Sequence, residues 1–140
     1  MTDPSVGTLP DGARDDAKRA RRPIGAYPPI YLLTGEFPPR LGGISDYTAR
    51  LAESLVGMGL QVTVLVGRDH PLEPSVVPEG VGLVRLRSTV SEWKLLPAVA
   101  ALLGGEAAIV HIQYQTAAFG MHPAIAFLPS WLCWRCPSVR

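Results

Sequence analysis

Apolar residues gather in short runs along the chain, and these runs alternate with segments of helical period. Residues 30–34 form a continuous apolar run, which is typical of a strand covered on both faces. From Ile44 onward, apolar side chains recur every three or four positions as far as Met58. This spacing predicts one buried face of a helix that Gly59 terminates in a left-handed conformation. A second buried strand is expected over residues 61–66.

The next segment differs because it alternates apolar and basic side chains over residues 81–87. A half-polar strand of this kind belongs at the edge of a sheet. The helix expected after it has Ser91 as a candidate N-cap, although Pro97 favours a later start. Gly104 and Gly105 are expected to end it.

A fourth strand over residues 108–113 and a helix from Pro123 to about Trp134 complete the pattern. The order β-α-β-β-α-β-α predicts an α/β fold: a Rossmann-like, doubly wound, mostly parallel sheet with strand order 3-2-1-4 and three main helices. Ligands in such sheets bind where the first and fourth strands end, which here means residues 35–43 and 114–120.

Two domain-level expectations follow from the same pattern. Residues 1–27 contain Pro, Gly, Asp and Arg without periodicity and are expected to be a disordered tail. Residues 28–140 are expected to form a partial Rossmann-like domain, whose fifth strand is missing or cut because the chain stops at residues 137–140.

Composition and charge narrow the function classes. A net charge of +1 argues against a nucleic-acid partner. A cytoplasmic location is expected, since residues 1–22 lack the apolar core of a signal peptide. The apolar stretch 117–134 is interrupted by prolines and is a poor transmembrane helix. Cys133 and Cys136 lack the further ligands of a zinc site and are expected to be buried or half-buried thiols.

The candidate chemistry begins with Gly42 and Gly43 at the first strand-to-helix junction. Paired glycines allow a ligand to approach the backbone, and the free N–H groups of a helix start favour an anion. The dinucleotide fingerprint, the P-loop motif and the nucleophile elbow are all absent from the sequence. The junction therefore predicts a phosphate- or nucleotide-using site of another type.

Further motifs surround this junction and continue along the chain: Phe37-Pro38-Pro39, Gly42-Gly43-Ile44, Tyr47, Arg50-Leu51-Ala52, Leu55, the stretch 59–65 and the stretch 108–115. Together they resemble the N-terminal half of GT-B glycosyltransferases, in the large retaining family of glycogen-synthase-like and mannosyltransferase-like enzymes (glycosyltransferase family 4-like). The resemblance covers about residue 30 to the C-terminus.

By this resemblance, the chain is the acceptor-binding half of an enzyme that moves a sugar from a nucleotide-sugar donor to a hydroxyl acceptor. Gly42 and Gly43 would approach the donor diphosphate, with Arg40 either assisting or lying solvated in its loop. No metal and no cofactor are expected, and the catalytic residue stays unassigned.

The fourth strand and its end supply the expected acceptor site. Gln113, Tyr114 and Gln115 have amide and phenol groups that exchange hydrogen bonds with sugar hydroxyls. His111 is a further candidate, with a packed histidine of the core or cleft as the alternative. Tyr47 is expected in the core, and His122 is a candidate cap of the last helix.

The sequence also departs from the family. The paired glutamates and the phosphate-binding Arg/Lys pair of the family's donor domain are absent, so the chain is expected to be inactive alone and to need a donor domain in cis or in trans. A non-catalytic α/β module that binds a phosphate or a sugar is the alternative. A nucleotide-sugar epimerase or a methyltransferase is a third reading, which the missing glycine fingerprint disfavours. Peripheral membrane contact stays open.

Overall fold

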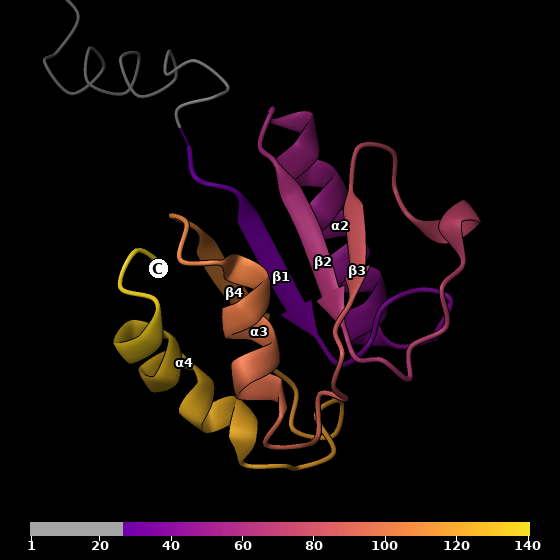
Figure 1. Ribbon diagram of the computed structural model, residues 1–140. Helices are drawn as coiled ribbons and strands as arrows, with labels where there is room; N and C mark the ends of the chain where they lie inside the picture. Colours follow the sequence, from indigo (N-terminus) through magenta and orange to yellow (C-terminus); the bar gives the residue numbers. More distant parts are fainter. Residues whose placement is uncertain (1–26) are drawn as a thin grey trace, which may run out of the picture.

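The computed structural model describes residues 27–140, which form a parallel sheet with helices on both faces (Figure 1). The expectation of a disordered tail concerns residues 1–26 almost entirely and so lies outside the described residues. The elements in chain order are β1 (Ile30–Thr34), α2 (Gly43–Gly57), β2 (Val62–Val66), a short 3-10 helix η1 (Pro74–Val76), β3 (Gly82–Arg85), α3 (Leu95–Leu103), β4 (Ile109–Gln113) and α4 (Ala124–Arg135).

The sheet has four strands in the order β3-β2-β1-β4, and every pairing is parallel. The predicted fold class and strand order are therefore confirmed. The chain runs outward from β1 to β3 and then crosses back to place β4 on the other side of β1. This reversal makes the carboxyl ends of β1 and β4 neighbours, with Thr34 opposite Gln113 in the register.

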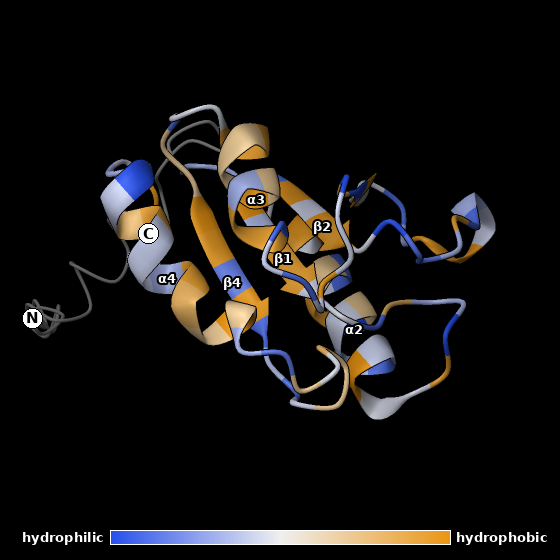
Figure 2. Cartoon of the chain, turned by 60° about the horizontal axis from the view of Figure 1, so that its bottom comes forward, coloured by the Kyte–Doolittle hydropathy of each residue, from blue (hydrophilic) through white to orange (hydrophobic). Residues whose placement is uncertain are grey.

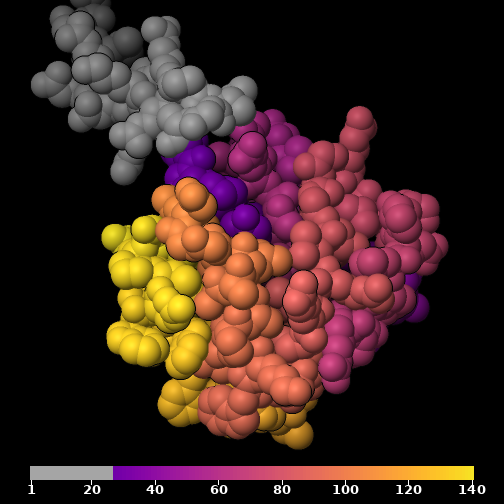
Figure 3. Space-filling view, viewed as in Figure 1, coloured from indigo at the N-terminus to yellow at the C-terminus, as the bar shows by residue number. Residues whose placement is uncertain are grey.

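The helices divide between the two faces of the sheet. Packed against α2 is a core that includes Leu32, Val64 and Ala52. On the opposite face, α3 and α4 lie side by side over a core that includes Leu33 and Leu128 (Figures 1 and 3). Because β1 and β2 are covered on both faces, their residues are almost all apolar (Figure 2).

The outer edge of β4 is paired only at its beginning within the described residues. Val139 forms a parallel bridge with Ala108, and the Arg140 amide donates to the Ala108 carbonyl at 2.8 Å. The Val110 amide donates to the Arg140 carbonyl at 2.7 Å. The last residues of the sequence therefore extend the sheet by a short parallel segment beside β4.

The helix ends agree with most of the sequence signals. Gly59 and Gly104 take left-handed φ angles of 81° and 60°, as expected of residues that terminate α2 and α3. The Ala124 amide donates to His122 Nδ1 at 3.1 Å, which confirms the predicted cap of α4. Within the described chain no side chain caps α3, so the Ser91 signal is wrong.

Two burial predictions are also corrected. Tyr47 is 55% exposed, because the face that α2 turns to the sheet holds the small residues Ser45, Thr48 and Ala52. Of the two cysteines, Cys136 is buried as expected but Cys133 is exposed. The side chains on the sheet-facing side of α2 are small, which lets the helix lie close to the sheet.

Candidate functional site

The two loops expected to form the site are in contact. They are named here the β1 loop (residues 35–43) and the β4 loop (residues 114–120). A Cβ atom added to Gly35 would lie 2.0 Å from the Ala118 carbonyl oxygen, so only glycine allows this approach. The contact fixes the β4 loop against the end of β1 and brings the two sets of candidate residues to one edge of the sheet.

The N-terminus of α2 is open to a ligand. Gly42 is the N-cap and has extended backbone, and Gly43 is exposed with nothing within 4 Å of a Cβ built on it. No side chain of the described residues caps the helix. The first N–H groups of a helix have no intrahelical partner, and the helix dipole makes this end attractive to an anion.

An acidic side chain also lies at this opening. Glu36 is the second residue after β1, and its Oε2 would be 2.7 Å from a Cβ atom on Gly42. An anion at Gly42 therefore shares its surroundings with a carboxylate. Sequence reasoning missed Glu36, although its position one residue after Gly35 at the end of a central strand was the available signal.

A third loop, the β2 loop (residues 67–70), lies against the β1 loop. The Arg40 guanidinium forms an ion pair with the Asp69 carboxylate at 3.2 Å and also donates to the Asp69 carbonyl at 3.2 Å. Both side chains are partly exposed, at 39% and 52%. Arg40 is therefore held toward the β2 loop through Nη2.

His70 completes the contact between the β1 and β2 loops. Its side chain is buried, and Nε2 lies 3.3 Å from the Pro38 carbonyl oxygen. Its backbone amide donates to Gly67 and its carbonyl accepts from Arg85. Burial lowers the pKa of the imidazole below its ordinary value of 6.5, against the opposing effect of the bond to Pro38.

The expected acceptor residues differ in exposure. Gln113 is buried at the end of β4, and its Nε2 has no hydrogen-bond partner within the described chain. Tyr114 and Gln115 are exposed on the β4 loop. The Tyr114 ring stacks on Phe119 with centroids 6.1 Å apart, and its hydroxyl accepts from Thr116 at 3.4 Å.

His111 lies on the sheet face that α2 covers, opposite Leu32 in the register. The alternative of a packed histidine is wrong, since the side chain is exposed. The reason is that α2 packs on β1 and β2 and leaves that face of β4 open. The hydrophilic segment within β4 is visible in Figure 2.

Further buried polar groups lie at the start of α2. Ser45 and Thr48 are fully buried, and their hydroxyls have no partner among the described residues. Their positions on the sheet-facing stripe of α2 place them over the same face of the sheet as Thr34 and Gln113.

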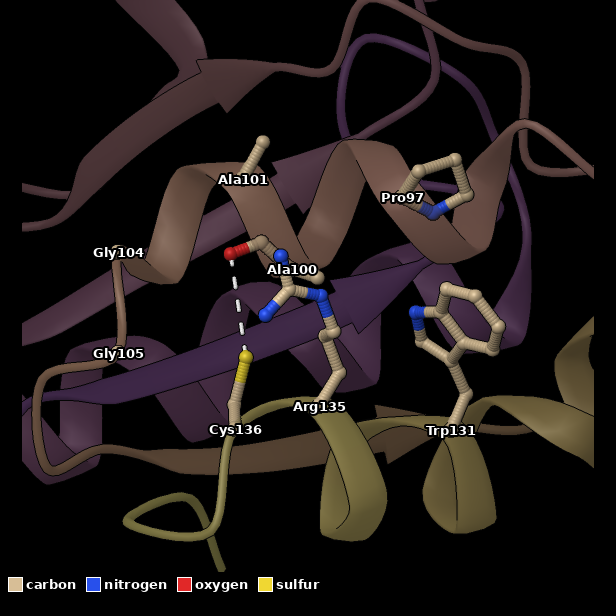
Figure 4. A pocket seen from close by; sticks show the side chains of 8 residues that line it. All are labelled: Pro97, Ala100, Ala101, Gly104, Gly105, Trp131, Arg135 and Cys136. Carbon is tan, nitrogen blue, oxygen red and sulfur yellow. Dashed lines mark hydrogen bonds between the residues drawn. The ribbon is translucent and has the colours of Figure 1, made fainter.

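A separate cavity of about 500 Å³ lies between α3 and α4 (Figure 4). Trp131 and Arg135 of α4, and Cys136 just after it, point toward the small residues of α3, which leave the space unfilled. Cys136 Sγ lies 4.0 Å from the Ala100 carbonyl oxygen. None of the candidate residues of the β1 and β4 loops lines this cavity, so it is a feature of helix packing apart from the predicted site.

Residues 27–140 contain neither a metal-binding cluster nor a helix suited to span a membrane. No group of three or more His, Cys, Asp or Glu side chains is placed to hold a metal ion in this part of the chain. Among the helices described, none has both the length and the apolar character needed to cross a bilayer.

Comparison with known proteins agrees with the geometry. The family model for the glycosyl transferase 4-like domain matches residues 42–139, from the first glycine of the pair to the bridge beside β4. Comparisons with curated proteins and with solved structures gave no match. The family match covers most of the sequence and includes the start of α2, β4 and the β4 loop. The chain therefore belongs to the family of glycosyl transferase 4-like domains.

Proposed function

We propose that this chain is the acceptor-side half of a retaining, GT-B glycosyltransferase, which works with a second domain that holds the nucleotide-sugar. The observation on which this rests is the open N-terminus of α2, facing the edge where the β1 and β4 loops meet. The family match supports a glycosyltransferase module, and it begins at Gly42.

In this proposal, Gly42 and Gly43 approach the donor diphosphate, and their end of α2 stabilises the charge that develops on the leaving phosphate. Arg40 joins them by releasing Asp69, which lies 3.2 Å away in the free chain. A divalent metal is not required for this stabilisation, because the amides and the guanidinium supply the positive potential.

The acceptor is a hydroxyl compound bound along the end of β4. Gln113, Tyr114, Gln115 and His111 are the proposed contacts, since each offers donors or acceptors to a hydroxyl group. The unpaired amide of buried Gln113 supports this role, because a bound hydroxyl would supply the missing partner. Glu36 adds a carboxylate that can accept from a hydroxyl beside Gly42.

The proposed phosphate contact can be tested with pyrophosphate, which represents the donor diphosphate. The variant G43A adds a methyl group that points toward the N-terminal end of α2 and into the anion's space. We expect affinity measured by NMR titration to fall about tenfold, as for the loss of one charge-assisted contact. The matched control is G57A at the other end of α2, where a Cβ also meets nothing within 4 Å.

Equal pyrophosphate affinities for G43A and G57A would contradict the proposed contact. The catalytic part of the proposal needs a second assay, in which nucleotide-sugar hydrolysis and transfer are measured with and without a separately supplied donor domain. Turnover is expected only with that domain. Appreciable turnover by the 140-residue chain alone would show that the donor site lies elsewhere. Binding without transfer in either case would favour a non-catalytic module.

A further inference from the structure

The contact between the β1 and β2 loops depends on a histidine that the proposed reaction does not use. His70 is 1% exposed, and only one of its two ring nitrogens has a partner in the described chain. The two residues of this contact, Pro38 and His70, are 32 positions apart in the sequence. One side of this contact is the segment that leads to Gly42.

The identity of the partner fixes the protonation state of the ring. The Pro38 carbonyl oxygen can only accept a hydrogen bond, so His70 Nε2 must carry the hydrogen. In the neutral ring Nδ1 then carries a lone pair. Nδ1 is buried without a partner, so the site fits a neutral Nε2–H imidazole.

Protonation would disturb this arrangement. A second N–H would appear at Nδ1, where the described residues offer no acceptor, and an unpaired buried donor is unfavourable. The charged groups that face the ring are Arg40 from the β1 loop, Asp69 from the β2 loop and Arg85 from β3. Burial, the largest effect, lowers the pKa of the ring, and the two guanidinium groups act in the same direction, whereas the bond to Pro38 and the Asp69 carboxylate favour the charged form.

We infer that His70 is a positioning residue for the anion-binding end of α2: its neutral form holds the Pro38–Arg40 turn against the β2 loop, and its protonation releases that turn. This role rests on the proposed function in one respect, namely that the turn leads to the phosphate contact. Binding of a diphosphate would then be strongest above the pH at which His70 becomes charged.

The test compares the wild-type chain with two variants between pH 5.5 and 8. In H70Q the side-chain amide can take the place of Nε2 and donate to Pro38, but it does not titrate. The shorter amide of H70N corresponds to Nδ1 and does not reach Pro38. The readouts are the His70 ring resonances and the backbone amide shifts of Arg40, Gly42 and Gly43, recorded by NMR on the full 140-residue chain.

In the wild type, these amide shifts are expected to follow the titration of the His70 ring. In H70Q they should stay at the wild-type high-pH positions throughout, whereas in H70N they should be displaced at every pH. The inference is overturned if the three amides titrate equally in H70Q, or if they ignore the ring's titration in the wild type. The second criterion uses no variant, so it holds even if H70N does not fold.

Pyrophosphate titrations at both ends of the pH range separate this inference from the proposed function. A wild-type affinity that falls about tenfold on acidification, with no such change in H70Q, supports both, because the unpaired charged Nδ1–H opens the buried contact and displaces the turn. Absence of pyrophosphate binding at every pH, with the His70-dependent amide shifts intact, contradicts the phosphate contact and leaves the positioning role supported.

Discussion

At the scale of single residues, several polar side chains of this domain are buried but incompletely paired. Gln113, Thr48 and His70 each contain a polar atom with no partner within the described chain. Such atoms cost stability unless a ligand or a water satisfies them. Gln113 ends β4, His70 lies in the loop after β2, and Thr48 faces the sheet from α2, so each belongs to an element or loop next to the proposed site.

The buried imidazole of His70 makes the stability of the fold depend on pH. The pKa is lowered in the folded state by burial, so below about pH 6.5 the unfolded chain binds a proton that the folded chain does not. The free energy of unfolding should therefore fall as the pH drops from 6.5 through the lower folded pKa. Urea denaturation at several pH values measures this.

The matched variants are H70Q, which removes the titrating ring, and H111Q, which changes a histidine exposed on β4. The loss of stability between pH 7.5 and pH 5.5 should be smaller in H70Q than in the wild type and unchanged in H111Q. An identical loss in all three chains would mean that another group is responsible.

At the scale of elements, the sequence predicted the strands and helices well because period alone distinguishes them. The apolar run of β1 was placed without error, and α2, β2 and β4 were correct to within a residue or so at each end. The order 3-2-1-4 followed because the third strand alternates with arginines and so belongs at an edge.

The remaining errors have physical causes that a single sequence does not show. Tyr47 and Thr48 both lie near the apolar stripe of α2, and only the close approach of helix and sheet decides that the smaller one is buried. Asp69 and His70 were missed as site residues because their partners lie 29 and 32 positions away on another loop. Which loops contact one another is decided only when the strands assemble and their ends come to lie along one edge of the sheet.

The packing of α4 provides a prediction about how the helical layer is held. Leu128 is completely buried beneath α3 and α4, whereas its neighbour Phe127 is 56% exposed and contacts Trp93 at a ring distance of 5.6 Å. L128A should lower the free energy of unfolding by about 2–5 kcal/mol, through lost transfer energy and a cavity. F127A removes a larger side chain and should nevertheless cost less. The reverse order in urea denaturation would contradict this description of the core.

At the scale of the whole molecule, the order of the strands reverses between β1 and β4, and the loops that follow these two strands contact each other. On one side are β1, β2 and β3 with α2, and on the other are β4 and α4. The contact between Gly35 and Ala118 connects them at the proposed site. Through this contact the two loops meet at one edge of the sheet.

That contact can be tested by a pair of glycine substitutions. In G35A the new methyl would lie 2.0 Å from a backbone oxygen, so the β4 loop must move. Overpacking of this kind costs about 1–3 kcal/mol of stability. G43A adds the same methyl group to open space in α2 and should be neutral or slightly stabilising. Calorimetric unfolding compares them, and a G35A chain as stable as G43A would rule out the close approach.

The short segment beside β4 also has a practical consequence. Val139 runs parallel to Ala108, so anything joined after Arg140 sets out along β4 toward the carboxyl ends of the strands. An affinity tag fused at that end would be delivered to the rim that contains the β4 loop. Ile30, where β1 begins, lies at the opposite rim, so a tag joined directly to Tyr27 in a shortened chain would start away from the β4 loop and is the better design for binding assays.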